Sequence, residues 1–203
     1  MTNVAIIDHG AGNLVSVTNA LTAIGAAPRV ITSPAGLATA DAVVLPGVGA
    51  TGAAMDRLNE TGMADAVTAW EGPLLGICVG LQLLFDRSDE DAQPCLGLMA
   101  GTVRQVTGQP LPHMGWNDVN HRRDPLFDGI PSGEPFYFVH SYAPAPLDED
   151  QTIATAHHGS PFTAAVRSRN RVGVQFHPER SGAAGFRLLS NFVANVTEPS
   201  RVA

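Results

Sequence analysis

A cysteine flanked by two glycines, in the stretch Gly76-Ile77-Cys78-Val79-Gly80, limits the possible folds of this chain more than any other feature. An apolar run precedes this stretch, and the run at residues 81–85 follows it with apolar-periodic spacing. The pattern predicts a strand, a sharp turn and a helix, with the thiol of Cys78 at the turn. The glycines permit strained backbone angles and close approach of other segments. The start of the predicted helix favours thiolate over thiol at Cys78.

Apolar runs alternate with helical periodicity in the first half of the chain, which predicts a parallel sheet covered by helices on both faces. The expected strands are residues 4–7, 29–31, 42–45 and 74–77. The expected helices are residues 13–24 and 53–70, the second with a break at Gly62. We therefore expect an α/β fold, in which a three-layer open sheet has a parallel core.

The second half of the chain contains short strand patterns separated by turn signals, which indicate an antiparallel extension of the same sheet. These strands are expected at residues 102–106, 116–119, 136–139, 152–155, 163–166 and 172–176. A last helix is expected from about 182 to 196, and residues from about 197 to 203 are expected to fray. With no linker or repeat in the sequence, we expect one domain over residues 1–203.

The charge composition excludes several kinds of chemistry. The chain of 203 residues has a net charge of −7, and its twelve basic residues are all arginine. Without lysine there is neither a Schiff-base nucleophile nor a Walker A lysine. The acidic balance argues against nucleic-acid binding. We find no membrane span and no signal peptide, so we expect a cytoplasmic protein without a membrane partner.

Metal binding and disulfide formation are also not expected. The two cysteines, Cys78 and Cys95, are too few for a cysteine-rich zinc site, and a disulfide between them is not expected in the cytoplasm. The pair His157-His158 has no third ligand at useful spacing, so we expect a solvated turn there.

The stretch His177-Pro178-Glu179 follows a predicted strand and supplies a candidate general base. Residues two apart in an extended segment point the same way, so the imidazole and the carboxylate can lie together. Strands of a parallel sheet present their carboxyl ends to one crevice, which would also contain Cys78. An imidazole held by a carboxylate is what a cysteine nucleophile requires.

The turn that follows the third strand is a candidate oxyanion site. In Leu45-Pro46-Gly47-Val48-Gly49, the glycines allow the backbone N–H groups of residues 47–49 to face the crevice. A second donor would be the N–H of Val79, next to the nucleophile. Each motif alone is more often structural, as a buried cysteine or a simple turn. Together, and in this order, they predict acyl chemistry by Cys78, His177 and Glu179.

The chain resembles the class I glutamine amidotransferases over nearly its whole length. Within that family it is most similar to the glutaminase subunits of imidazole glycerol phosphate synthase, from histidine biosynthesis. The motifs that carry the resemblance are residues 8–14, 46–49, 76–85, 112–117, 136–142 and 175–182. The resemblance implies a flavodoxin-like fold and hydrolysis of L-glutamine to glutamate and ammonia through a γ-glutamyl thioester. It implies no metal and no cofactor.

The resemblance also assigns the substrate site. Gln82, four residues after the nucleophile, matches a substrate contact of the family. Glu90 matches the acidic residue that holds the substrate amino group. Ser141 and Tyr142 match the segment whose backbone binds the α-groups of glutamine. Apart from this resemblance, the sequence would indicate that Gln82 and Glu90 lie on an ordinary helix surface.

A partner subunit is implied in the same way. The family passes ammonia through a tunnel to a cyclase, a (β/α)8 barrel with which it forms a heterodimer. The products of that cyclase are imidazole glycerol phosphate and an aminoimidazole carboxamide ribotide. Positions near the subunit interface are matched by Asn13, Trp116, Asn117 and Arg180. From the sequence alone, core packing is an equally good interpretation of Trp116.

The chain departs from the family pattern at several positions, and other destinations for the ammonia stay open. The departures are His9, Val15, Thr51, Leu81 and Arg180. One alternative is the glutaminase subunit of another synthase, for anthranilate or aminodeoxychorismate. A second alternative is a catalytically silent binding subunit, against which the intact Cys78, His177 and Glu179 argue.

Overall fold

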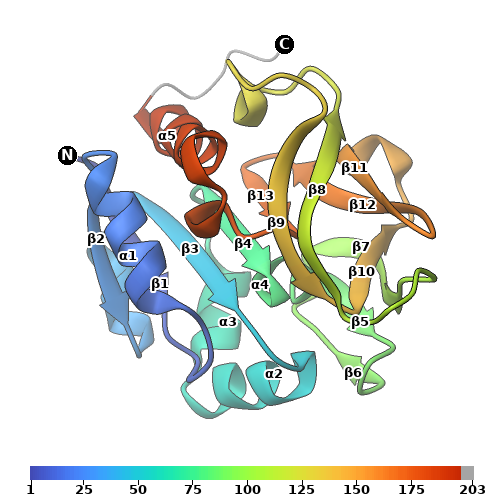
Figure 1. Ribbon diagram of the computed structural model, residues 1–203. Helices are drawn as coiled ribbons and strands as arrows, with labels where there is room; N and C mark the ends of the chain where they lie inside the picture. Colours follow the sequence, from blue (N-terminus) through green and yellow to red (C-terminus); the bar gives the residue numbers. More distant parts are fainter. Residues whose placement is uncertain (198–203) are drawn as a thin grey trace.

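The computed structural model describes residues 1–197 of the chain, and its main feature is a nine-stranded sheet (Figure 1). The strand order is β2-β1-β3-β4-β13-β12-β11-β8-β9. The strands are β1 (Asn3–Ile7), β2 (Ala27–Ile31), β3 (Ala42–Gly47), β4 (Leu74–Cys78), β8 (His113–His121), β9 (Glu134–His140), β11 (Thr152–His158), β12 (Ser160–Ser168) and β13 (Arg171–Val174). Strands β2, β1, β3, β4 and β13 pair in parallel, and the pairs from β13 to β9 are antiparallel. The predicted parallel core with an antiparallel extension is confirmed.

Helices cover both faces of the parallel half, which gives the predicted three layers (Figure 1). The helices are α1 (Leu14–Ala23), α2 (Thr51–Glu60), α3 (Met63–Thr68) and α5 (Gly182–Thr197), with 3-10 turns η1 (Pro34–Thr39), η2 (Pro125–Phe127), η3 (Glu149–Gln151) and η4 (Pro178–Arg180). The side chain of Asn13 caps α1 by accepting from the N–H of Ser16. Gly62 separates α2 from α3 with φ of 69°, so the predicted break is confirmed.

A second sheet is present that the sequence patterns do not predict. Four strands in the order β10-β7-β5-β6 form it: β5 (Phe85–Ser88), β6 (Gln93–Pro94), β7 (Met99–Gln105) and β10 (Tyr142–Pro146). The strand expected at 102–106 therefore belongs to this sheet and does not extend the main one. Prolines at 94, 144 and 146 hide two of these strands, because proline weakens a strand pattern.

The helix expected after Cys78 is a single short turn. Helix α4 spans Val79–Gln82, and Phe85 already begins β5. The apolar run at 81–85 suggests helical periodicity, but Leu81, Leu83, Leu84 and Phe85 are all completely buried. Burial on every side removes the amphipathic signal that separates a helix from other buried segments. The dipole of so short a helix is small, so the local N–H groups matter more at Cys78.

The core follows from the burial of the central strands. All six residues of β3 and all five of β4 are buried, as expected for strands covered on both faces. Within residues 1–197, no helix is long and apolar enough to cross a membrane. Helix α5 includes Thr197, and the rest of the expected frayed tail, 198–203, lies outside the described residues.

Candidate active site

The register of the parallel strands brings the candidate catalytic motifs together. In the β3–β4 pair Gly47 lies opposite Cys78, so the candidate oxyanion turn begins beside the candidate nucleophile. In the β13–β4 pair Val174 lies opposite Ile77. The residues that follow Val174 therefore leave the sheet at the same edge as Cys78. This edge is formed by the carboxyl ends of the strands, where sites in α/β sheets are expected.

The turn at Cys78 has the strained backbone of a nucleophile elbow. Cys78 has φ of 54° and ψ of −110°, which is unusual for a residue with a side chain. A Cβ at position 80 would lie 1.7 Å from the carbonyl oxygen of Leu45. Only glycine at position 80 therefore permits this approach of the elbow to β3. The strained backbone angles of Cys78 persist because the surrounding structure enforces them.

The imidazole of His177 interacts with both the carboxylate of Glu179 and the sulfur of Cys78. Its Nδ1 is 2.9 Å from Oε1 of Glu179, and both side chains are almost completely buried. Among the described residues, Nε2 of His177 forms no hydrogen bond. Burial lowers the pKa of His177, but interactions with Cys78 and Glu179 outweigh it and raise the pKa to about 10. The predicted Cys78, His177 and Glu179 thus meet in one buried cluster, arranged to stabilise an imidazolium beside a sulfur.

The segment that carries His177 is fixed to strand β9. The N–H of His177 donates to the carbonyl of Tyr137 over 2.9 Å. The hydroxyl of Ser181 donates to the carbonyl of His177 over 2.6 Å and accepts from the N–H of Tyr137 over 3.0 Å. These three bonds give the imidazole of His177 a rigid backbone support.

Gln175 lies within one of the family motifs and beside Cys78, but the sequence alone assigns it no role. Its side chain is completely buried, and its Nε2 lies 3.6 Å from Sγ of Cys78. Its Oε1 accepts from Nε2 of Gln82 over 3.2 Å. The signal is present in the sequence, because Gln175 is an amide two residues before the base at the end of a parallel strand.

The candidate oxyanion turn is anchored by His9. Nε2 of His9 donates to the carbonyl of Pro46 over 2.7 Å, and the ring is buried. Val48 is 37% exposed and Gly49 has φ of 87°, so the turn after Gly47 leaves the sheet toward the surface. In the sequence His9 is only a departure from the family pattern, and its contact with Pro46 requires the folded structure.

A small cavity of about 120 Å³ adjoins the cysteine and contains all four predicted substrate residues. Its lining includes Val48, Gly49, Cys78, Val79, Gln82, Glu90, Val139, His140, Ser141 and Tyr142. Oε2 of Glu90 accepts from the N–H of Thr51 over 3.1 Å. This bond fixes the carboxylate beside the cavity, although Glu90 follows the end of α4 by several residues.

The carbonyl groups at the β9–β10 junction already have partners. The carbonyl of Ser141 accepts from the N–H of Val106 over 3.0 Å. The carbonyl of Tyr142 accepts from Nε2 of Gln82 and from Nδ1 of His140, each over 2.9 Å. A ligand in the cavity would therefore meet this segment mainly through N–H groups, which suit a carboxylate.

The four residues matched to a subunit interface are all at least partly exposed, to different extents. Trp116 is 58% exposed, which decides against the core-packing interpretation. Its ring lies 6.1 Å from the ring of Tyr137, and the guanidinium of Arg180 lies 4.1 Å from the centre of that same ring. Asn13 is exposed at the start of α1, and Asn117 is half-buried on β8.

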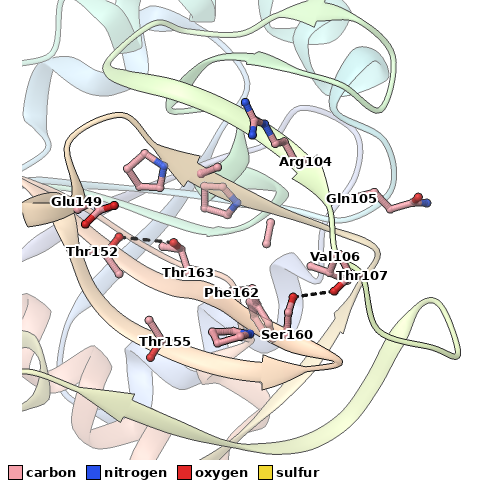
Figure 2. Close-up of a pocket in the computed structure, with 15 residues that line it drawn as sticks. Arg104, Gln105, Val106, Thr107, Glu149, Thr152, Thr155, Ser160, Phe162 and Thr163 are labelled. Carbon is pink, nitrogen blue, oxygen red and sulfur yellow. Dashed lines mark hydrogen bonds between the residues drawn. The ribbon is translucent and has the colours of Figure 1, made fainter.

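A larger groove of about 520 Å³ lies elsewhere, between β7, β10, β11 and β12, and contains none of the predicted site residues (Figure 2). Hydroxyl groups line much of it, and one pair, Thr107 and Ser160, is joined by a hydrogen bond of 2.6 Å. Cys78, which belongs to both the elbow and the buried cluster, lines the smaller cavity, which we therefore take as the site.

The histidine pair at 157–158 does not form the expected solvated turn. Both residues end strand β11, and the ring of His158 stacks on His113 with 4.4 Å between ring centres. The strand pairing with β12 places the turn at Gly159 instead. Within residues 1–197, no group of three or more potential ligands is arranged to hold a metal ion.

Comparison with known proteins agrees with this geometry. Residues 5–196 match the family described as Glutamine amidotransferase class-I. Over 197 residues, the chain is 49% identical to a protein of Xanthomonas euvesicatoria pv. vesicatoria (strain 85-10) named Imidazole glycerol phosphate synthase subunit HisH. It is 48% identical to the protein of the same name from Xylella fastidiosa (strain Temecula1 / ATCC 700964). Each alignment covers 95% of this chain and 98% of the relative.

Solved structures with the same fold have much lower identity. One is described as a glutamine amidotransferase, with a TM-score of 0.77, 20% identity and coverage of 96% of this chain and 98% of that one. Another is PurLQS from Thermotoga maritima, with a TM-score of 0.75, 19% identity and coverage of 97% and 99%. These likenesses confirm the α/β fold. On the family match and the near-complete alignment with its relatives, the chain belongs to the class I glutamine amidotransferases.

Proposed function

We propose that this chain is the glutaminase subunit of an imidazole glycerol phosphate synthase and supplies ammonia for histidine biosynthesis. The observation that carries the proposal is the buried cluster of Cys78, His177 and Glu179 at the carboxyl edge of the sheet. The relatives named as subunits of that synthase support the choice of pathway. The proposed reaction converts L-glutamine and water to glutamate and ammonia.

In the proposed mechanism, Sγ of Cys78 attacks the side-chain amide carbon of glutamine. His177 receives the thiol proton and then delivers it to the departing nitrogen, which leaves as ammonia. A γ-glutamyl thioester remains on Cys78. Water, deprotonated by His177, attacks the thioester and releases glutamate with return of the proton to sulfur. Glu179 orients the imidazole and stabilises its cation, as its contact with Nδ1 allows.

The oxyanion of each tetrahedral intermediate would be held by backbone N–H groups of Gly47, Val48, Gly49 and Val79. Support comes from the pairing of Gly47 with Cys78 and from the position of Val79 directly after the nucleophile. Each donor of this kind is worth roughly 10²–10³ in rate. A glycine-rich turn with an exposed Val48 can change its backbone orientation, so we expect the isolated subunit to be slow.

Substrate recognition is proposed to use the cavity residues predicted from the sequence. Both N–H groups of Gln82 are engaged by Tyr142 and Gln175, so its Oε1 is the atom left to accept from glutamine. Glu90 would receive the α-ammonium group. The N–H groups of the Ser141–Tyr142 segment would receive the α-carboxylate. Thiol, imidazole and carboxylate supply the nucleophile and the acid–base groups, so the reaction requires no metal or cofactor.

The proposed partner is a cyclase of (β/α)8 barrel form, bound as a heterodimer at the face that contains Asn13, Trp116, Asn117 and Arg180. Exposed aromatic and arginine side chains are typical anchors of protein interfaces. Ammonia would pass to the cyclase and be incorporated into imidazole glycerol phosphate, with release of an aminoimidazole carboxamide ribotide. The proposed compartment is the cytoplasm, where this biosynthesis would take place.

The test is co-purification with the cyclase, followed by a glutamine-dependent synthesis assay. We expect a stable complex, and glutamine hydrolysis that rises at least about 100-fold over that of the free subunit, the value of one oxyanion donor. The anthranilate and aminodeoxychorismate synthases, tested in parallel, should give neither. Equal rates for the complex and the free subunit would contradict the proposed activation, and stimulation by another synthase would contradict the proposed pathway.

A further inference from the structure

A chain of side-chain hydrogen bonds connects the candidate interface strand β8 to the substrate cavity. Nδ2 of Asn117 lies 3.1 Å from Nε2 of His113, and Nδ1 of His113 lies 3.0 Å from Nε2 of His140. Nδ1 of His140 then lies 2.9 Å from the carbonyl oxygen of Tyr142. Neither histidine belongs to the catalytic cluster, and both are more than 90% buried.

The chemistry of the two ends fixes the direction of every bond in this chain. The carbonyl of Tyr142 can only accept, so Nδ1 of His140 carries hydrogen and its Nε2 is an acceptor in the neutral ring. That acceptor requires a hydrogen on Nδ1 of His113, which leaves Nε2 of His113 to accept from Asn117. The amide nitrogen of Asn117 also donates to the carbonyl of His157 over 2.9 Å, so its orientation is fixed independently.

The electrostatic environment keeps both rings neutral. Burial, together with the nearby His158, lowers the pKa of His113 to about 4. Burial lowers the pKa of His140 to about 3, against a hydrogen bond to Tyr142 that raises it. A proton added to His140 would put its Nε2–H against the Nδ1–H of His113, and a proton added to His113 would put its Nε2–H against the side-chain amide of Asn117. The donor order from Asn117 to Tyr142 is therefore the only one that the geometry accepts.

The order continues into the cavity through Gln82. Its Nε2 donates to the same Tyr142 carbonyl and to Oε1 of Gln175, which presents its own Nε2 to Sγ of Cys78. Because both donors of Gln82 are used, the acceptor Oε1 remains for the substrate. Loss of the bond from His140 would leave the Tyr142 carbonyl with one partner and free this segment to move.

We propose that His113 and His140 are positioning residues for glutamine hydrolysis. They hold the Tyr142 carbonyl in place. Gln82 then presents its acceptor oxygen to glutamine, and the Ser141–Tyr142 segment presents its N–H groups. The inference rests on the proposed glutaminase function. It assigns the two histidines to binding of the substrate and not to proton transfer at the sulfur.

The test compares three variants in complex with the cyclase. His140→Phe keeps an aromatic ring beside Phe138 and Phe162, whose ring centres lie 5.6 and 5.0 Å from that of His140, but removes the donor. His140→Asn retains a donor at the Nδ1 position. His121→Phe is the matched control, because His121 lies on β8 together with His113 and stacks on Phe127, outside the cavity lining.

We expect the KM for glutamine to rise at least about tenfold in His140→Phe, since a buried carbonyl loses a partner, while kcat falls less than about threefold. His140→Asn should recover most of the loss, and His121→Phe should match the wild type. A KM for His140→Phe within about threefold of the wild type, or no recovery in His140→Asn, would overturn the proposal. A wild-type complex without glutaminase activity would instead refute the proposed function.

A second measurement does not depend on activity or on the stability of a variant. Nitrogen NMR of the histidine-labelled wild-type protein at neutral pH reports which ring nitrogen carries hydrogen. We expect neutral Nδ1–H tautomers for both His113 and His140. An Nε2–H tautomer or a charged ring at either position would break the donor order and overturn the proposal.

Discussion

Nδ1 of His177 lies 2.9 Å from Oε1 of Glu179 in a pair whose side chains are 4% and 1% exposed. A carboxylate buried this deeply requires a compensating charge or hydrogen bonds, and the imidazolium supplies both. The pair therefore holds His177 ready to carry a proton beside Cys78. The proposed chemistry depends on this protonated state, because the leaving nitrogen must receive that proton.

The raised pKa of His177 gives a prediction about Cys78. Interactions with Cys78 and Glu179 raise this pKa to about 10 against the effect of burial, so Cys78→Ala should lower it well below 10. Histidine NMR over a pH titration measures the value in both proteins. A pKa for His177 that stays near 10 in Cys78→Ala would contradict the coupling.

The same shift predicts how stability depends on pH. A folded-state pKa above the ordinary 6.5 stabilises the protein fully below pH 6.5, and the contribution is lost as pH rises toward about 10. The free energy of unfolding of the wild type should therefore fall more between these values than that of Cys78→Ala. Denaturant titrations at several pH values provide the measurement. Parallel pH profiles for the two proteins would be inconsistent with this assignment.

His9 is expected to control the oxyanion turn through the carbonyl of Pro46. Replacing it in His9→Phe keeps the bulk but removes the donor, and kcat for glutamine should fall about tenfold with little change in KM, since the N–H groups move from their best positions. His9→Gln restores a donor and should recover most of the rate. Steady-state assays of the complex measure both, and an unchanged kcat in His9→Phe would rule out this role.

Gly80 is predicted to tolerate no side chain. A Cβ there would lie 1.7 Å from the carbonyl oxygen of Leu45, so Gly80→Ala must displace the elbow or β3 and should cost more than about 3 kcal/mol of stability. The matched control is Gly133→Ala, where φ is 90° but no atom lies within 4 Å. That change should cost only about 1–2 kcal/mol. Thermal denaturation of both variants provides the measurement, and a loss in Gly80→Ala no larger than that in Gly133→Ala would contradict the steric conflict with Leu45.

Trp116 is predicted to anchor the partner subunit. Truncation in Trp116→Ala should weaken binding of the cyclase by at least about 2 kcal/mol, roughly 30-fold in Kd, as is typical of a buried aromatic anchor. Leu147, which is 78% exposed, provides a control in Leu147→Ala. Calorimetric titration measures both affinities. Equal affinities for the two variants would remove Trp116 from the interface.

The parallel half of the fold can be predicted because its signals are local. Strands β3 and β4 are continuous apolar runs, and Gly62 marks the break between α2 and α3. The second sheet escapes prediction because β5 and β6 are short, β6 and β10 contain prolines, and β10 pairs with β7 from a distant part of the sequence. The length of the helix after Cys78 is overestimated. The apolar residues at 81–85 are completely buried, so their pattern does not distinguish a helix from another buried segment.

The site can be predicted to the extent that its residues lie in recognisable motifs after strands. The cluster of Cys78, His177 and Glu179 belongs to this class. His113 and His140 receive no role from the sequence, because their partners come from other elements and only the folded chain brings them together. For Gln175 the sequence offers only its position two residues before His177, and its contact with Cys78 requires the folded chain. The contact of His9 with Pro46 spans 37 residues and has no local signal either.

The most direct test of the central claim is the glutamine-dependent and the ammonia-dependent synthesis of imidazole glycerol phosphate by the complex that contains Cys78→Ala. Without the sulfur no thioester can form, so glutamine should support no synthesis, while added ammonia should support the wild-type rate. Synthesis from glutamine that survives the substitution would contradict the assignment of Cys78 as the nucleophile.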